Sequence, residues 1–173
     1  MRVIGVVGNP STPSRTGVLV SSALHGCSSA PTEDALIDLA PLGPELLARG
    51  PAAREAVERV KAADLVIIGS PVYKASYTGL LKLFLDLFNA GDLAGKVALP
   101  LMVGGSELHS LALPCHLIPV LAELGAISVP GGYFIESTID KPNRTLNADA
   151  AQALAALLRI AVSHANAAAV GAP

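Results

Sequence analysis

The chain has 173 residues, of which 51% are hydrophobic, and its 12 basic and 14 acidic residues leave a formal net charge of −2. This length suffices for one domain with a substantial core, whereas the balanced charge lacks the basic footprint of a nucleic-acid-binding protein. No apolar run approaches the roughly eighteen residues of a membrane span, the start does not resemble a signal peptide, and two cysteines predict neither a disulfide framework nor a metal site, so we expect a cytoplasmic protein without membrane contact.

Apolar runs alternate with helical patterns along the whole sequence. Continuously apolar runs predict buried strands at residues 3–7, 35–39, 65–68, 97–103 and 127–135. Helical periodicity predicts helices at residues 15–24, 52–62, 78–88, 108–124 and 147–166, the last capped by Asn147, and the Pro- and Gly-rich stretch 40–51 predicts a loop. This alternation is typical of an α/β fold with a parallel sheet covered on both faces. We expect one domain over residues 1–166 and a flexible tail over 167–173.

The loop after the first strand has the composition of a phosphate site. It offers one guanidinium, one amide and four hydroxyl groups, from Arg15, Asn9, Ser11, Thr12, Ser14 and Thr16. Because it leads into a helix, it also presents free backbone N–H groups and the positive end of the helix dipole. The lysine of a P-loop and the three glycines of a dinucleotide fingerprint are missing, so a terminal monophosphate such as that of FMN fits best. An ordinary Ser/Pro turn with a helix cap is the alternative.

The loop after the third strand predicts a site for a flat ring. Residues 69–79 read Gly-Ser-Pro-Val-Tyr-Lys-Ala-Ser-Tyr-Thr-Gly and join a strand end to a helix, the place where open α/β sheets bind ligands. Its Pro-Val-Tyr segment offers an apolar wall and backbone amides, which suit a flavin.

The helical run at residues 80–88 is apolar on nearly every side. Only Lys82 and Asp86 interrupt it, and their i, i+4 spacing allows them to pair. A helix of this kind is buried both against the sheet and against a second surface. A homo-oligomer interface, in a dimer or a tetramer, explains this most economically; a helix embedded within one chain is the alternative.

Together these loops resemble the NAD(P)H-dependent FMN reductase family, and especially the branch that supplies reduced flavin to alkanesulfonate monooxygenases. The resemblance covers residues 2–126. It rests on Gly8-Asn9-Pro10-Ser11, Ser14-Arg15-Thr16, the stretch 70–82, Gly95-Lys96, and Gly104-Gly105-Ser106 with His109. It implies a flavodoxin-like α/β/α sandwich with a five-stranded parallel sheet in the order 2-1-3-4-5, FMN with NADPH or NADH as cofactors, and a flavin-dependent monooxygenase as partner.

The resemblance also assigns roles to residues. It implies that Asn9, Ser11, Ser14, Arg15 and Thr16 form the phosphate loop, that Pro71, Val72, Tyr73 and Lys74 line the ring or the ribityl chain, and that Gly104, Gly105 and Ser106 complete the pocket. His109 either bonds the O2/N3 edge of the flavin or merely begins a helix. Hydride transfer between stacked rings needs no protein acid, base or nucleophile, so we predict no catalytic residue.

Two departures from the family pattern stand out. The family often has Ser at the position of Asn9 and Arg at that of Ser11, so this phosphate loop has one cation fewer. In the sulfonate branch, an inserted residue, often aromatic, makes a π-bulge at the subunit interface; here the stretch reads Leu-Pro-Cys-His-Leu at 113–117, and Pro114 disturbs the helix ladder. Neighbouring Cys115 and His116 point in different directions, which argues against a nucleophilic pair and leaves a structural or interface role.

Other functions fit parts of the sequence. A quinone or azo-dye reductase that keeps its FMN, a flavodoxin-like electron carrier, and a binding protein that has lost its flavin are the alternatives. Flavodoxins are strongly acidic and sandwich the flavin between aromatic rings. This chain has a net charge of −2 and one obvious ring, Tyr73, so one face of the flavin is expected to be open for a nicotinamide.

Overall fold

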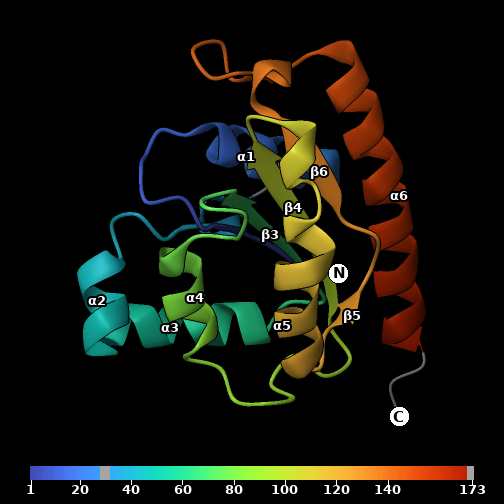
Figure 1. Ribbon diagram of the computed structural model, residues 1–173. Helices are drawn as coiled ribbons and strands as arrows, with labels where there is room; N and C mark the ends of the chain where they lie inside the picture. Colours follow the sequence, from blue (N-terminus) through green and yellow to red (C-terminus); the bar gives the residue numbers. More distant parts are fainter. Residues whose placement is uncertain (28–31, 171–173) are drawn as a thin grey trace.

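A parallel sheet runs through the middle of the computed structural model, which describes residues 1–27 and 32–170 (Figure 1). Its strands are β1 (Val3–Val7), β2 (Leu36–Asp38), β3 (Leu65–Pro71), β4 (Val97–Gly104), β5 (Ile127–Ser128) and β6 (Gly132–Ile135). They lie in the order β2-β1-β3-β4-β5, with β6 also paired to β4, and every pair is parallel. The predicted α/β fold and strand order 2-1-3-4-5 are confirmed.

The fifth position of the sheet is interrupted, contrary to the single strand expected at residues 127–135. Residues of β4 pair with β5 at Ala98 and resume with β6 at Leu101. The carbonyl of Ala98 accepts a hydrogen bond from the N–H of Val129. Alternate residues of a strand turn their backbone groups to the same side, so the backbone of Pro100 also faces the fifth position, between the end of β5 and the start of β6. Proline has no N–H to donate there. A Cβ at Gly131 would also collide with the Pro100 carbonyl.

Helices cover both faces of the sheet (Figure 1). They are α1 (Arg15–Cys27), α2 (Gly43–Ala48), α3 (Pro51–Lys61), α4 (Gly79–Leu85), α5 (Ile118–Glu123) and α6 (Ala148–Val170). One core joins alternate residues of the strands to α2, α3, α4 and α5, and the other joins the remaining strand residues to α1 and α6. Burial on both faces explains why the strand sequences are continuously apolar rather than alternating.

Several helix boundaries differ from the predictions. The expected loop 40–51 contains α2, because Pro44 lies in the first helical turn, where a missing N–H costs nothing. Helix α4 ends at Leu85 and continues as turns, instead of reaching residue 88. Helix α6 is capped by Asn147, whose Oδ1 accepts from the N–H of Ala150 at 2.9 Å, and it runs to Val170. Its last turn thus occupies residues 167–170 of the expected tail, and 171–173 lie outside the described residues.

The segment expected to be one helix at 108–124 is divided into three. A 3-10 turn (Glu107–His109) is followed by a π-helix (Leu113–Leu117) and then by α5. The π-helix coincides with the stretch in which Pro114 was expected to disturb the ladder. A hairpin that the sequence analysis did not predict, β7 (Ile139–Asp140) with β8 (Thr145–Leu146), packs on α1.

Candidate functional site

A cavity of about 180 Å³ lies where β1, β3 and β4 end. It brings together the loop that follows β1, the loop that follows β3 and the end of β4, as well as residues from the far end of the chain. Its lining residues are Asn9, Ser11, Pro13, Ser14, Arg15, Thr16, Pro71, Tyr73, Val103, Glu136 and Lys141. The carboxyl edge of a parallel sheet is the usual ligand site of this architecture.

The loop after β1 is organised by its own side chains. The Oδ1 of Asn9 accepts from the N–H of Ser11 at 2.9 Å, and its Nδ2 donates to the hydroxyl of Thr16 at 3.3 Å. The Oγ of Ser14 accepts from the N–H of Gly17 at 3.0 Å and so caps α1. Asn9, Ser14 and Thr16 are buried, although all three are polar. The loop therefore has a fixed shape around the first turn of α1.

That shape leaves donors for an anion. The first N–H groups of α1, beginning at Arg15, have no carbonyl within the helix to bond, and the dipole adds positive potential. The guanidinium of Arg15 is half exposed, and its Nη1 lies 3.9 Å from the Oε2 of Glu136, which is equally exposed. This distance is too long for a hydrogen bond, so Arg15 is held only loosely. The carboxylate of Glu136 is the ion-pair partner of this arginine among the described side chains.

A tight turn after β3 carries the aromatic ring of Tyr73. The backbone groups of Tyr73 and Ser76 bond each other in both directions, at 2.8 and 3.1 Å. The two central residues, Lys74 and Ala75, have φ angles of 51° and 62°, a combination that type I′ turns require and that residues other than Gly rarely adopt. Strain of this kind is common at ligand sites. The turn holds the Tyr73 side chain, which is 50% exposed, at the mouth of the cavity.

The turn does not offer as many backbone donors as expected. The N–H of Val72 donates to Val103 at 2.7 Å, and that of Tyr73 donates to Ser76. Val72 packs against the core below, and neither it nor Lys74 lines the cavity. Of the four residues predicted to line the ring, Pro71 and Tyr73 reach the cavity.

A buried pair of hydroxyls ties the two loops together. The hydroxyl of Thr78 donates to the carbonyl of Gly8 at 2.5 Å and accepts from the N–H of Leu81 at 3.1 Å, capping α4. The Oγ of Ser70 accepts from the N–H of Thr78 at 3.1 Å. Thr78 and Ser70 are at most 2% exposed. Neither residue was predicted to have a role, although a threonine directly before an apolar helix is a recognisable cap signal.

The Gly-Gly-Ser loop after β4 lies beside the cavity without lining it. Ser106 accepts a hydrogen bond on its carbonyl from the hydroxyl of Tyr133 at 2.6 Å, and burial raises the pKa of that phenol. A Cβ at Gly104 would collide with the Tyr133 ring, which explains the glycine. Gly105 and His109 are exposed, and His109 belongs to a 3-10 turn. None of these predicted residues lines the cavity, although their loop follows directly after Val103, which does.

Lys141 was not predicted as a site residue. It belongs to the turn of the β7–β8 hairpin and lines the same cavity as Arg15. The phosphate loop was expected to have one cation fewer than its family pattern, and Lys141 brings a cation to the same place from more than 120 positions away. No local pattern around residue 141 marks this role, because the hairpin reaches the cavity through its packing on α1 and α6.

Other candidates from the sequence do not form a site. Cys115 and His116 are both exposed on the π-helix. Among the side chains that the structure describes, no group of three or more from His, Cys, Asp or Glu is placed to hold a metal ion. None of the helices in the ranges 1–27 and 32–170 has the length and apolar character needed to cross a membrane.

The donor set fits the phosphate of a flavin mononucleotide. A cation from each side, hydroxyls at Ser11 and Ser14, and free helix N–H groups surround a space of about 180 Å³, below the 300–1,000 Å³ or so of pockets that enclose a small molecule. It can therefore hold a phosphate and leave a ring outside, against Pro71 and Tyr73.

Comparisons with known proteins agree with this geometry. A family model described as NADPH-dependent FMN reductase matches residues 1–140. The FMN reductase (NADPH) of Escherichia coli K12 is 39% identical over 142 residues, which cover 80% of this chain and 74% of that protein. The NADH-dependent FMN reductase SfnE of Pseudomonas putida is 33% identical over 95% of this chain and 90% of its own length. A crystal structure of an apo NADH:FMN oxidoreductase (EMOB) superimposes with a TM-score of 0.80 at 33% identity, covering 95% and 88% of the two chains.

Proposed function

The chain belongs to the NADPH-dependent FMN reductase family, and from this premise we propose that it is an NAD(P)H:FMN oxidoreductase that supplies reduced FMN to a partner monooxygenase. The overall reaction moves a hydride from the nicotinamide C4 of NADPH or NADH, together with a proton from solvent, to FMN. We place it in one FMN-binding domain over residues 1–166 and in the cytoplasm.

The residues of the cavity have the chemistry that this reaction needs. Arg15, Lys141, the Ser11 and Ser14 hydroxyls and the first turn of α1 bind the phosphate, and Pro71 and Tyr73 form a wall beside the ring. Bound FMN supplies the hydride acceptor N5. The protein then has to hold two rings in contact and needs no acid or base for the transfer. Asn9 and Thr16 line the same cavity and give the loop its shape. The other predicted residues lie outside the lining and are assigned to the surroundings of the site: Val72, Lys74, Gly104, Gly105, Ser106 and His109.

One observation carries the proposal. The phosphate-type loop at 9–16 and the ring-type loop at 71–73 line a single cavity, although they are about sixty positions apart in the sequence. The hydroxyl of Thr78 fixes one loop to the other. Flavodoxins sandwich their flavin between aromatic rings, whereas Tyr73 is the one aromatic ring among the described residues that line the cavity. This favours a reductase that leaves one face of the flavin to the nicotinamide.

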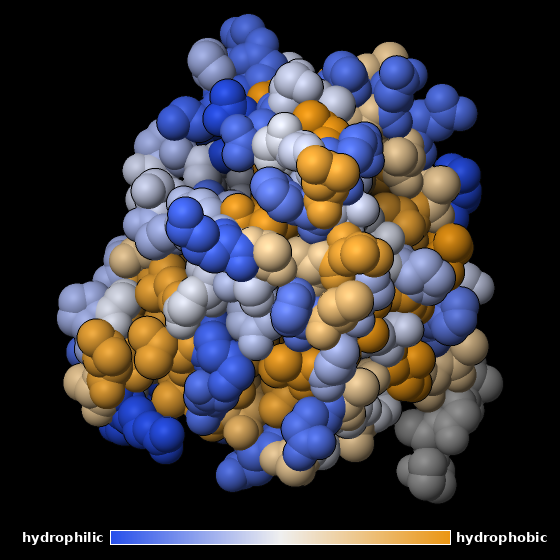
Figure 2. All heavy atoms as spheres, in the orientation of Figure 1, coloured by the Kyte–Doolittle hydropathy of each residue, from blue (hydrophilic) through white to orange (hydrophobic). Residues whose placement is uncertain are grey.

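We propose that two helical regions form a homo-oligomer interface. Leu80, Leu83 and Leu87 of the α4 region are partly buried, and α2 contacts α4 from the same chain, so part of the expected interface is already covered. Hydrophobic atoms reach the surface on both sides of α4 (Figure 2). Leu108 and Leu111, 87% and 67% exposed, lie just before the π-helix and are the apolar anchors that a second copy would bury.

The test is a steady-state assay of NADPH and NADH oxidation with FMN, FAD and riboflavin as acceptors. We expect turnover with FMN, and the ratio of the two dinucleotide rates gives the preference. A desalting column then separates the alternatives, because an enzyme that releases flavin loses it there and a quinone or azo-dye reductase keeps it. No oxidation of either dinucleotide in the presence of FMN would refute the proposal.

A further inference from the structure

A second hollow adjoins the phosphate end of the FMN site. It is a groove of about 560 Å³, and it shares Pro13, Ser14 and Lys141 with the cavity described above. It extends over β1 and β2, past Leu36 and Asp38. The ring wall lies over β3 and β4, on the other side of the phosphate loop, so the groove leads away from the ring. A group attached to the far side of the phosphate would enter it.

The charges in the groove favour an anion. Lys141 and Arg144 line it from the β7–β8 turn, against the single carboxylate of Asp38. Neither cation forms an ion pair with any residue whose side chain the structure describes. One oxygen of Asp38 accepts from the N–H of Ala40 at 3.0 Å, which leaves the other as an acceptor for a ligand hydroxyl. Two free cations with one acceptor suit a phosphate that carries a sugar.

The hairpin that presents these cations is held in shape. Asn143 donates to Asp140 twice, from its backbone N–H at 3.1 Å and from its side chain at 2.8 Å. Arg144 has a φ of 55°, and its N–H donates to the carbonyl of Lys141 at 3.3 Å. Ile139 is buried in the core beside α1. The two cations are therefore placed by a pinned turn and not by a free loop, and Figure 1 shows this turn at the end of the molecule where α1 begins.

The floor of the groove is apolar. Val7 and Val18 are buried beneath it, and Leu36 is half-buried at its edge. The volume of about 560 Å³ falls inside the usual range for small-molecule pockets. An aromatic base can lie flat on aliphatic side chains of this kind, while its sugar and phosphate meet the charged rim.

From this arrangement we propose that the groove binds the adenylate half of FAD. This placement rests on the proposed FMN site, because the first phosphate of FAD occupies the position of the FMN phosphate. Arg144 and Lys141 bind the second phosphate. Asp38 accepts a hydrogen bond from the ribose, and the adenine lies over Val18 and Leu36. Lys141 lines both hollows and serves FMN and FAD alike, whereas Arg144 lines the groove but not the FMN cavity and serves FAD. The chain thus takes the dinucleotide flavin as well as FMN, with Arg144 as the residue that sets its affinity for FAD.

The test is calorimetric titration of the full chain, freed of flavin, with FMN, FAD and riboflavin. In the wild type we expect FAD to bind within about tenfold of FMN. Arg144→Gln is expected to raise the Kd for FAD by about tenfold, the size of one charge-assisted contact, and to leave FMN and riboflavin unchanged. Arg144→Lys restores most of the affinity, and Lys141→Gln weakens FMN and FAD together. Arg159→Gln, an exposed arginine on α6, is the control and changes neither.

A second titration, with 5′-AMP, separates the possible sources of the adenylate. We expect AMP to compete with FAD and not with FMN. If Arg144→Gln raises the KM for NADPH with FMN as acceptor and leaves the Kd of FAD alone, the groove belongs to the nicotinamide dinucleotide and the inference is wrong. It is also wrong if the variant weakens FMN and FAD equally or weakens neither. Failure of the wild type to bind FMN at all would count instead against the proposed function.

Discussion

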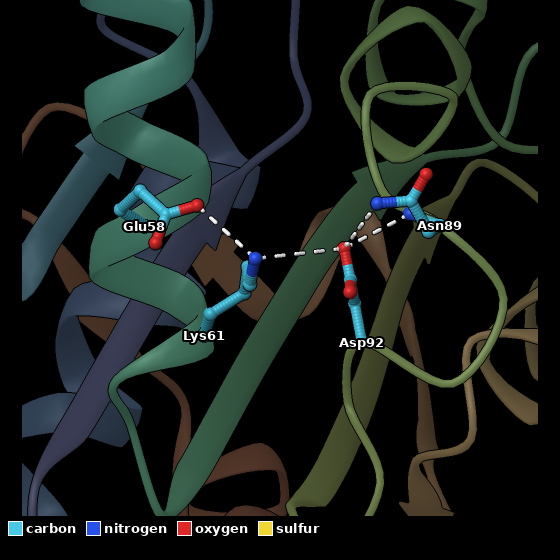
Figure 3. A network of polar contacts seen from close by, with 4 residues as sticks. All are labelled: Glu58, Lys61, Asn89 and Asp92. Carbon is cyan, nitrogen blue, oxygen red and sulfur yellow. Dashed lines mark hydrogen bonds and ion pairs between the residues drawn. The ribbon is translucent and has the colours of Figure 1, made fainter.

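Two charged hollows lie at opposite edges of the sheet, and they differ in how their lysines are paired. At the amino edge, Lys61 contacts Glu58 at 3.1 Å and Asp92 at 3.8 Å, and Asp92 accepts from both nitrogens of Asn89 (Figure 3). These residues line a hollow of about 440 Å³. At the carboxyl edge, Lys141 forms no ion pair with a described side chain, and Arg15 has one loose contact with Glu136. Arg49 and Arg54 also line the hollow at the amino edge, and neither forms an ion pair with a side chain that the structure describes. Unpaired cations alone therefore do not mark a site; at the carboxyl edge they lie beside the free N–H groups at the start of α1.

The largest effect is expected at Thr78, whose buried hydroxyl joins the two loops at the carboxyl edge of the sheet. We expect Thr78→Val to lower the free energy of unfolding by about 2 kcal/mol, because a buried carbonyl and a helix N–H both lose their partner. The melting temperature should fall by about 4–8 °C, and FMN affinity should fall with it. Thr78→Ser keeps the hydroxyl and should preserve both. If the valine variant is as stable as the wild type, the Thr78 hydroxyl does not hold the two loops together.

The next effect is on phosphate recognition. We expect Arg15→Ala to raise the Kd of FMN by about tenfold, since one charge-assisted hydrogen bond is lost, and to leave riboflavin, which has no phosphate, almost unchanged. The loss should shrink as salt is added, because the guanidinium is half exposed. Titrations of both flavins at low and high salt measure it. Equal losses for FMN and riboflavin would exclude Arg15 from the phosphate site.

A smaller change should strengthen binding. Glu136→Gln removes the carboxylate that lies 3.9 Å from Arg15 and frees the guanidinium for the phosphate. Because exposed ion pairs are weak, we expect the Kd of FMN to fall by only about two- to threefold, again without an effect on riboflavin. Weaker FMN binding in this variant would show that Glu136 supports the site and does not compete with the ligand.

The smallest effect is expected at the amino edge. Hydrogen bonding to Glu58 is the main cause that raises the pKa of Lys61 above its ordinary value of 10.5. A raised pKa means that the stabilisation is present below pH 10.5 and is lost as the pH rises through the raised value. Lys61→Met should therefore melt slightly earlier than the wild type at pH 7 and converge with it at strongly alkaline pH. Its Kd for FMN should be unchanged, and a changed Kd would contradict the separation of the two hollows.

The sequence predicted those parts of the site that are built locally. Asn9, Ser14 and Thr16 form their hydrogen bonds within one loop, so their arrangement follows from a strand, a loop and a helix in succession. The turn at Tyr73 was found for the same reason, as a strand end that leads into a helix. The Pro-containing break in the helix after β4 was also predicted from Pro114, and a π-helix occupies residues 113–117.

The parts that were missed depend on segments far apart in the chain. Pro44 was interpreted as a loop signal, although the first turn of a helix accepts it. The bond from Thr78 to Gly8 joins positions separated by 70 residues, and neither residue alone indicates it. Lys141 is one of several exposed lysines in the sequence, and nothing near it indicates that it lies beside Arg15.

By itself, the sequence determined the alternation of apolar runs and helical patterns, and with it a doubly wound sheet with a phosphate-type loop after its first strand. Periodicity and loop composition are local, so they survive without knowledge of the fold. Only the tertiary structure decided which charges meet at the carboxyl edge, because the β7–β8 hairpin packs on α1 and carries Lys141 and Arg144 to the phosphate loop. The physical reason is that the distance between Lys141 and Arg15 depends on how the hairpin packs against α1, and not on how far apart the two residues are in the sequence.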